Sequence, residues 1–134
     1  MYDNKDIAEK FSSDWYSGQG VIYFIAAGNP PKAVKIGVAK LDGIKRRLRG
    51  IQSSNHELIE LLGVITFESG DKPLLQAERK EQELHKKFSH YQRIVDGLVG
   101  HEWFSAGEDL LGFIDSNTIR PEELNLPHHV TKLA

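Results

Sequence analysis

Hydrophobic residues along the chain follow two kinds of spacing. Three runs are dense in β-branched and aromatic residues, which is typical of strands: residues 21–27 (VIYFIAA), 33–40 (AVKIGVAK) and 58–67 (LIELLGVITF). The turn residues GNPP at 28–31 join the first two runs, so we expect these two to form a β-hairpin.

Apolar residues recur at helical spacing in the stretches between and around these runs. They predict a short N-terminal helix over residues 4–16, a helix over 44–52, a long helix from Pro73 to about Arg93 and a final helix over 108–115. Strands and helices in this order, with a hairpin first, indicate an α+β fold in which helices cover one small sheet.

The same pattern divides the chain into three parts. We expect residues 1–19 to form a helical extension and residues 20–116 to form the main domain. Residues 117–134 are expected to be a weakly structured C-terminal tail.

Composition narrows the class of protein. The chain has 134 residues, of which 40% are hydrophobic and 27% charged, as in ordinary globular domains. It has no apolar run of the roughly 18 residues that a membrane span needs, and its N-terminus does not resemble a signal peptide, so a cytoplasmic protein is expected. Because the chain has no cysteine, a metal ion would need oxygen or imidazole ligands, which favours Mg²⁺ or Mn²⁺.

Charge is distributed unevenly along the chain. The formal net charge of −2 does not by itself point to a polyanionic partner. Residues 32–49, however, carry seven basic side chains against one acid, Asp42. The seven are Lys32, Lys35, Lys40, Lys45, Arg46, Arg47 and Arg49. This segment could line a phosphate-binding groove.

One carboxylate on the predicted long helix breaks its amphipathic pattern. Glu81 falls inside the arc of apolar residues around Ala77 and Leu84, and a buried carboxylate is normally tolerated only beside a cation or a water-filled cleft. Glu81 is therefore a candidate metal ligand, with an ion pair to a residue such as Arg47 as the alternative. His85 borders the same arc; it could bind metal, orient water or contact phosphate, or it could be a hydrogen-bonded packing histidine.

Basic residues on the predicted short helix fall into two groups. Arg47 borders the apolar stripe, where its planar guanidinium could clamp a phosphate. Lys45, Arg46 and Arg49 are candidates for contacts that position a nucleic-acid backbone, with solvation alone as the alternative for Arg46 and Arg49.

The first two strands carry two further candidates. Tyr23 and Lys35 can approach each other across the hairpin. Alone, a strand tyrosine is usually a core residue and a strand lysine is usually solvated. Their occurrence together with Arg47 and Glu81 favours a common site.

In type, order and approximate spacing, these residues resemble the motifs of the GIY-YIG nuclease superfamily. More narrowly, the chain is similar to the branch named after a bacteriophage open reading frame and a meiotically up-regulated yeast gene, over residues 20–113. The motifs of that branch correspond here to Tyr23-Phe24-Ile25, Lys35-Ile36-Gly37, Arg47-Leu48, Glu81-Gln82-Glu83-Leu84-His85 and Glu102-Trp103-Phe104. Val21 stands in place of the opening glycine, Lys35 in place of the second tyrosine, and Ile51 in place of a further tyrosine.

The resemblance implies a small three-stranded antiparallel sheet flanked by helices, with the first tyrosine, the helix arginine and the later glutamate converging on one surface. It implies an endonuclease that uses one divalent cation. The expected site residues are, for catalysis, Tyr23, Lys35, Arg47 and His85; for the metal ion, Glu81; for nucleic-acid contact, Lys45, Arg46 and Arg49; and for support of the site, Gly37, Glu102 and Trp103.

The sequence therefore predicts a metal-dependent endonuclease that acts on nucleic acid, with DNA as the expected substrate. The alternative is a catalytically inactive nucleic-acid-binding module of the same fold. A metal hydrolase built on His85, His101, His128 and His129 has little support, because no HExxH or comparable spacing occurs. DNA against RNA, a homodimer and a targeting partner protein all stay open at this stage.

Overall fold

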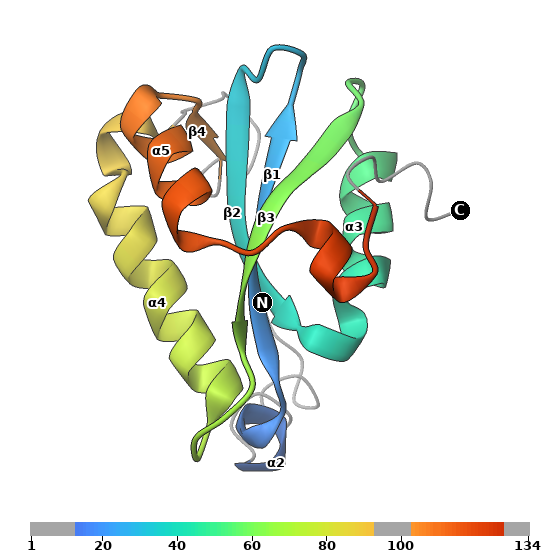
Figure 1. Cartoon of the computed structure of the whole chain (residues 1–134), viewed down its shortest axis with the longest axis vertical. Coiled ribbons are helices and arrows are strands. Elements are labelled where there is room, and N and C mark those ends of the chain that lie inside the picture. The colour runs from blue at the N-terminus through green and yellow to red at the C-terminus, as the bar shows by residue number, and fades with distance from the viewer. Residues whose placement is uncertain (1–12, 93–102, 128–134) are drawn as a thin grey trace, which may run out of the picture.

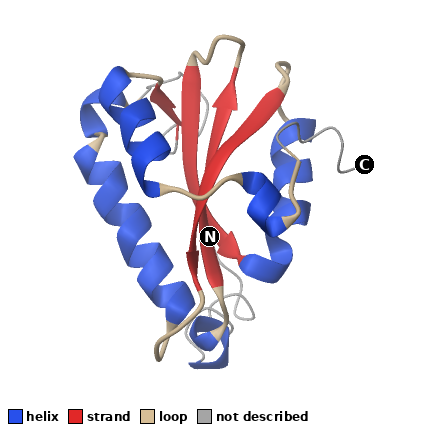
Figure 2. Ribbon diagram, viewed as in Figure 1, coloured by secondary structure: helices blue, strands red, loops and turns tan. Residues whose placement is uncertain are grey.

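The computed structural model describes residues 13–92 and 103–127, which form an α+β fold with helices on both sides of one antiparallel sheet (Figures 1 and 2). In chain order the elements are α2 (Ser13–Ser17), β1 (Gly20–Ala27), β2 (Ala33–Lys40), η1 (Leu41–Gly43), α3 (Ile44–Ser53), β3 (Ile59–Phe67), α4 (Pro73–Lys87), η2 (Ser89–Tyr91), β4 (Trp103–Ser105), α5 (Glu108–Asn117) and η3 (Pro121–Leu124). The predicted α+β class is confirmed.

The sheet has four strands in the order β3-β1-β2-β4, so the expected number of three is wrong. The additional strand, β4, is only three residues long, which is too short for an alternating pattern to be recognised. It is recruited by pairing with residues 33–35 of β2, far away in the sequence. The predicted hairpin is present, and its register places Tyr23 opposite Gly37 and Ile25 opposite Lys35.

Alternation along β1 divides the core into two clusters, one on each face of the sheet. Tyr23 and Ile25 point to the face that α3 covers, and Ile22 and Phe24 point to the face that α4 and α5 cover. All eight residues of β1 are buried, because the strand is central in the sheet and has helices on both faces. In Figure 1, α3 lies on the right of the sheet and α4 and α5 lie on the left.

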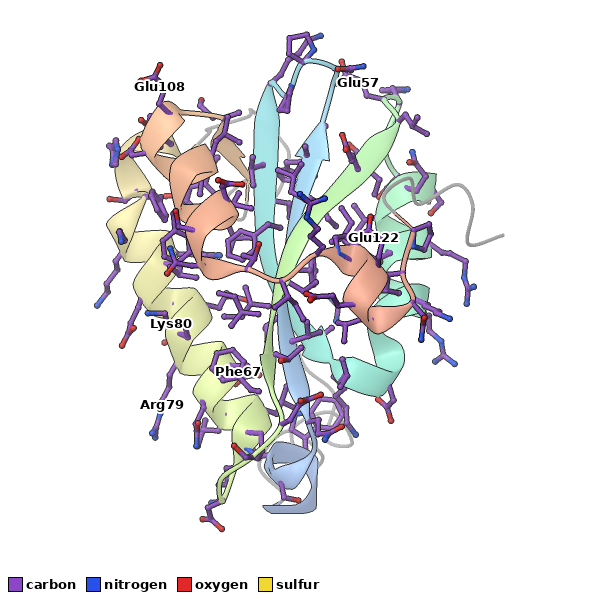
Figure 3. The ribbon with its side chains drawn as sticks, in the orientation of Figure 1. Glu57, Phe67, Arg79, Lys80, Glu108 and Glu122 are labelled. Atoms are coloured by element: carbon purple, nitrogen blue, oxygen red, sulfur yellow. The ribbon has the colours of Figure 1, made fainter. Side chains whose placement is uncertain are left out.

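The two main helices use their apolar stripes as the sequence predicts. On α3, Ile44, Leu48 and Ile51 are buried against the first face. On α4, Ala77 and Leu84 are buried against the second face. Figure 3 shows the opposite side of α4, where Arg79 and Lys80 point away from the sheet, while Phe67 of β3 points towards the helix.

The long helix ends earlier than expected. Pro73 begins it, as predicted, but the last residue of α4 is Lys87 and not a position near Arg93. A 3-10 turn, η2, follows, and Gln92 then forms a bridge with Phe104 of β4. The chain must leave the helical conformation to reach this bridge, so a long-range pairing overrides the local helical pattern.

The segment after α5 differs from the weakly structured tail that the sequence predicts. Residues 118–120 cross the β3 edge of the sheet from the α5 side to the α3 side (Figure 1), and Ile119 pairs with Val64 there. Gly63 permits the crossing, because a Cβ at this position would lie 2.0 Å from the hydroxyl oxygen of Thr118. Leu126 then packs into the cluster beside α3.

The N-terminal helix predicted over residues 4–16 lies largely outside the described residues. The described part, α2, contacts α4, and Gly18 accepts a hydrogen bond from the backbone of Leu74. Within residues 13–92 and 103–127, no helix has the length and apolar character that crossing a bilayer requires.

Candidate functional site

The phenol of Tyr23 lies directly over Gly37 on the α3 face of the sheet. The two residues are cross-strand partners, and Tyr23 as a whole is 1% exposed. A Cβ at Gly37 would lie 2.3 Å from the Tyr23 hydroxyl oxygen, which is much closer than any real contact. The glycine therefore leaves the space that the tyrosine ring occupies, and the two residues together fix the position of the phenol.

Lys35 lies on the same face, two positions before Gly37. Its partners in neighbouring strands are Ile25 and Trp103, and residues paired in this way point to the same side of a sheet. Its Nζ lies 5.8 Å from the centroid of the Trp103 ring. The ammonium is therefore a diagonal neighbour of Tyr23, and Trp103 limits its freedom on the side of β4.

Arg47 is on α3, the helix that covers this face. Its side chain is exposed, as are those of Lys45, Arg46 and Arg49, so burial does not set Arg47 apart as the helical projection suggested. The long arginine side chain can extend past the edge of the apolar stripe into solvent. Its guanidinium is thus accessible to a ligand on the α3 side of the sheet.

Glu81 points inward from α4, on the other face of the sheet. Its side chain is 13% exposed, whereas that of Glu83 on the same helix is 71% exposed. This difference agrees with the helical periodicity. One carboxylate oxygen of Glu81 lies 3.7 Å from Nε2 of His85, which is one turn further along the helix.

His85 contacts two strands of the sheet. Its Nε2 lies 3.0 Å from the backbone carbonyl oxygen of Ile36 in β2. Its ring packs edge-on against Phe104 of β4, with 5.1 Å between the ring centroids. The helix turn that carries Glu81 is thereby held against β2.

Candidate residues from the two faces of the sheet meet at one peptide unit, the one between Ile36 and Gly37. Tyr23 covers it from the α3 face, and His85 contacts it from the α4 side. Strand β4 pairs with β2 only at residues 33–35. Among the described residues, no strand pairs with residues 36–40 on that side. A ligand at this edge could therefore reach groups from both faces.

The ion pair between Glu81 and Arg47 that the sequence left open is not formed within the described part of the chain. The two residues lie on helices that cover opposite faces of the sheet, and the carboxylate instead lies beside His85. The structure thus brings Tyr23, Lys35 and Gly37 together on one face and Glu81 and His85 on the other.

The sequence of the chain also matches a known domain family. The T5orf172 domain matches residues 20–117, well over half of the chain. The chain belongs to the T5orf172 domain family. No curated protein and no solved structure shows a significant match. The T5orf172 domain extends from β1 to the end of α5, and it contains the described candidate residues on both faces.

A metal ion in this T5orf172 domain would have few protein ligands. Residues 13–92 and 103–127 contain no group of three or more histidine, aspartate or glutamate side chains arranged to hold an ion. A hydrated Mg²⁺ needs only one or two carboxylates, since waters and substrate phosphates complete its octahedron. Glu81 can supply one such carboxylate. Glu102, which the sequence suggests as a residue that supports the site, lies outside the described residues.

A second polar cluster in the T5orf172 domain was not predicted from the sequence. The hydroxyl of Tyr91 in η2 donates a hydrogen bond to the carboxylate of Asp109 in the first turn of α5. Nε2 of His90 lies 3.4 Å from the same carboxylate. The hydrogen bond raises the pKa of Tyr91 and lowers the pKa of Asp109. The partners are far apart in sequence, so local pattern could not reveal the pair.

Proposed function

We propose that this protein is a GIY-YIG-type endonuclease that hydrolyses phosphodiester bonds of nucleic acid, with DNA as the expected substrate and one Mg²⁺ or Mn²⁺ as cofactor. Membership of the T5orf172 domain family supports a nuclease or nucleic-acid-binding role. The ordered set of Tyr23, Lys35, Arg47 and Glu81 supports the more specific assignment.

The observation that carries the proposal is the inward position of Glu81 beside the peptide that Tyr23 covers. A carboxylate that is 13% exposed loses much of its hydration, so its negative charge is stabilised when a cation binds beside it. The phenol and the carboxylate lie on opposite faces of the same strand, next to the edge. A phosphate at that edge could be approached from both sides.

Each side chain has a distinct task in this proposal. Tyr23 orients the attacking water or accepts its proton. The nearby Lys35 ammonium favours the phenolate form that proton acceptance requires. Arg47 neutralises charge on the phosphoryl oxygens through its planar fork.

Glu81 would hold the divalent cation. Such a cation, when bound, stabilises negative charge on the phosphate and on the departing oxygen. The remaining steps rely on the side chains of the chain itself, which place the water, the phosphate and the proton acceptor around the β2 edge.

The decisive experiment compares Glu81→Gln with Glu83→Gln in a supercoiled-plasmid nicking assay with Mg²⁺ or Mn²⁺. We expect Glu81→Gln to lower the nicking rate by about two orders of magnitude, because a pre-organised charge is removed. Glu83→Gln, which alters an exposed acid on the same helix, should retain the parental rate. Equal rates in the two variants would rule out the metal role of Glu81, and chelation with EDTA should stop nicking by the parent protein.

Arg47 and Tyr23 are tested in the same assay. Arg47→Ala should reduce nicking by about two orders of magnitude, whereas Arg79→Ala, on the outer side of α4, should not. Tyr23→Phe removes only the hydroxyl and tests the handling of water. A parental rate in Tyr23→Phe would transfer that role to Lys35.

A catalytically inactive nucleic-acid-binding module is the second candidate. The observation that favours it is α3, whose exposed surface carries four basic side chains and whose sequence contains no acid. Such a module would bind nucleic acid in a salt-sensitive way without metal-dependent nicking. Nicking by the parent protein that is abolished in Glu81→Gln would exclude it.

A further inference from the structure

The hydrogen-bond geometry of His85 fixes where its proton lies. A backbone carbonyl oxygen only accepts hydrogen bonds, so the 3.0 Å contact between Nε2 and Ile36 requires a proton on Nε2. In the neutral ring Nδ1 is then unprotonated. If Nε2 gave up its proton, two acceptors would face each other at this distance.

The hydrogen bond fixes the position of the His85 proton, and packing fixes the orientation of the His85 ring. The imidazole is held edge-on against Phe104, which is fully buried in the core on the α4 face. The His85 side chain is 19% exposed. A ring held by a strand carbonyl on one side and an aromatic ring on another has little freedom to rotate towards a substrate.

The same contact bears on Glu81. The carboxylate precedes His85 by one helical turn and lies beside the nitrogen that holds the carbonyl. Together with the burial of Leu84 on the same helix, the His85 contact therefore fixes how far Glu81 lies from the Ile36–Gly37 peptide and the Tyr23 phenol above it. A shift of about 1 Å in such an arrangement can cost on the order of 10²-fold in rate.

We infer that His85 is a positioning residue, which fastens the turn of α4 that carries Glu81 to β2 through an Nε2–H hydrogen bond to Ile36. It neither transfers a proton nor binds the metal. The inference about its effect on cleavage rests on the proposed nuclease function. The inference about its proton and its anchoring contact does not.

A pair of substitutions separates positioning from proton transfer. His85→Gln can place an amide N–H close to the position of Nε2 but cannot act as an acid or base. His85→Phe keeps a ring against Phe104 but has no donor for the Ile36 carbonyl. The matched control is His56→Phe, which changes an exposed histidine in the loop before β3.

We expect His85→Gln to retain nicking within about tenfold of the parent, because its amide N–H keeps a donor for the Ile36 carbonyl and a less ideal neutral hydrogen bond costs roughly that factor or less. His85→Phe should lower kcat by about 10²-fold, since Glu81 is no longer held in place, while KM changes little. Circular dichroism should show that both variants are folded. Equal reductions of about 10²-fold or more in the two folded variants would overturn the inference, because general acid or base catalysis needs the imidazole.

Two measurements test the anchor without any cleavage assay. Nitrogen-15 NMR of the neutral ring should show the proton on Nε2. Hydrogen exchange in the second half of α4 should be faster in His85→Phe than in His85→Gln or the parent. A proton on Nδ1, or equal exchange in all three proteins, would overturn the inference. Failure of the parent to nick DNA would instead count against the proposed function, and the NMR and exchange results would still decide the role of His85.

Discussion

At the residue scale, the contact between Tyr23 and Gly37 sets the position of the one phenol in the candidate site. The tyrosine ring fills the space above the glycine, and the register of the hairpin holds the two residues opposite each other. The position of the Tyr23 hydroxyl therefore depends on the missing side chain of Gly37 as much as on the tyrosine itself. This makes Gly37 a sensitive place to test the geometry.

Gly37→Ala should damage both the site and the fold. The new methyl group would lie 2.3 Å from the Tyr23 hydroxyl oxygen, so the phenol must move. We expect nicking to fall by about 10²-fold and the free energy of unfolding, measured with denaturant, to fall by about 1–3 kcal/mol. Gly50→Ala is the matched control, because nothing lies within 4 Å of the Cβ it would add on α3. A fully active Gly37→Ala protein would show that the position of the phenol does not matter for cleavage.

At the scale of elements, local patterns predicted the strands and the directions of side chains, and long-range pairing produced the differences. The faces of Tyr23 and Glu81 follow from periods of two and 3.6 residues, which the sequence displays directly. The contact between His85 and Ile36 joins residues 49 positions apart, so no local window contains it. Strand β4 and the early end of α4 also depend on long-range pairing, because β4 pairs with the edge of β2 and Gln92 then bridges to Phe104 of β4.

Long-range pairing does not explain why Arg47 is exposed although the sequence places it at the border of the apolar stripe. Helical projection gives the direction of a Cβ, and it correctly separates Leu48 from the solvent-facing positions of α3. It does not give the path of a long, flexible side chain beyond the Cβ. The direction of the arginine could be predicted from the sequence, but its burial could not.

The pair of Tyr91 and Asp109, which joins η2 to α5, gives a prediction about pH. The lowered pKa of Asp109 means that its contribution to stability is present above its ordinary value of 3.8 and is lost as the pH falls through the lowered pKa. The raised pKa of Tyr91 means that its contribution is present below its ordinary value of 10.0 and is lost as the pH rises through the raised pKa.

Tyr91→Phe should therefore lower Tm between these two limits, and the difference from the parent should shrink in stronger acid and in stronger base. Thermal unfolding followed across the pH range measures this difference. The double variant with Asp109→Asn provides the control, because Tyr91→Phe should have less effect once the carboxylate is gone. A difference in Tm that is the same at every pH would show that the pair acts through packing alone.

At the scale of the whole molecule, the sheet separates two sets of candidate side chains that meet at one edge. The α3 side carries the phenol, the ammonium of Lys35 and the exposed cations of the helix. The α4 side carries the carboxylate. At the other edge of the sheet, residues 118–120 cross over β3 and tie the two sides together. Binding of the nucleic-acid backbone and cleavage should consequently be separable by substitutions on the two sides.

Salt dependence of DNA binding tests this separation. The chain has a net charge of −2, so binding to a polyanion must come from a local surface, and α3 offers four exposed cations with no acid among its residues. For duplex DNA, the slope of log K against log salt concentration should become shallower by about 0.9 for each phosphate that the protein no longer neutralises.

The triple variant Lys45→Ala/Arg46→Ala/Arg49→Ala should weaken binding and flatten that slope in fluorescence-anisotropy titrations. The double variant Arg79→Ala/Lys80→Ala, on the outer side of α4, should leave the slope unchanged. In titrations without divalent metal, Glu81→Gln should bind at least as well as the parent, because it removes a negative charge from the edge. An unchanged slope in the α3 triple variant would move the nucleic-acid interface away from this helix and leave Arg47 without a bound phosphate to neutralise.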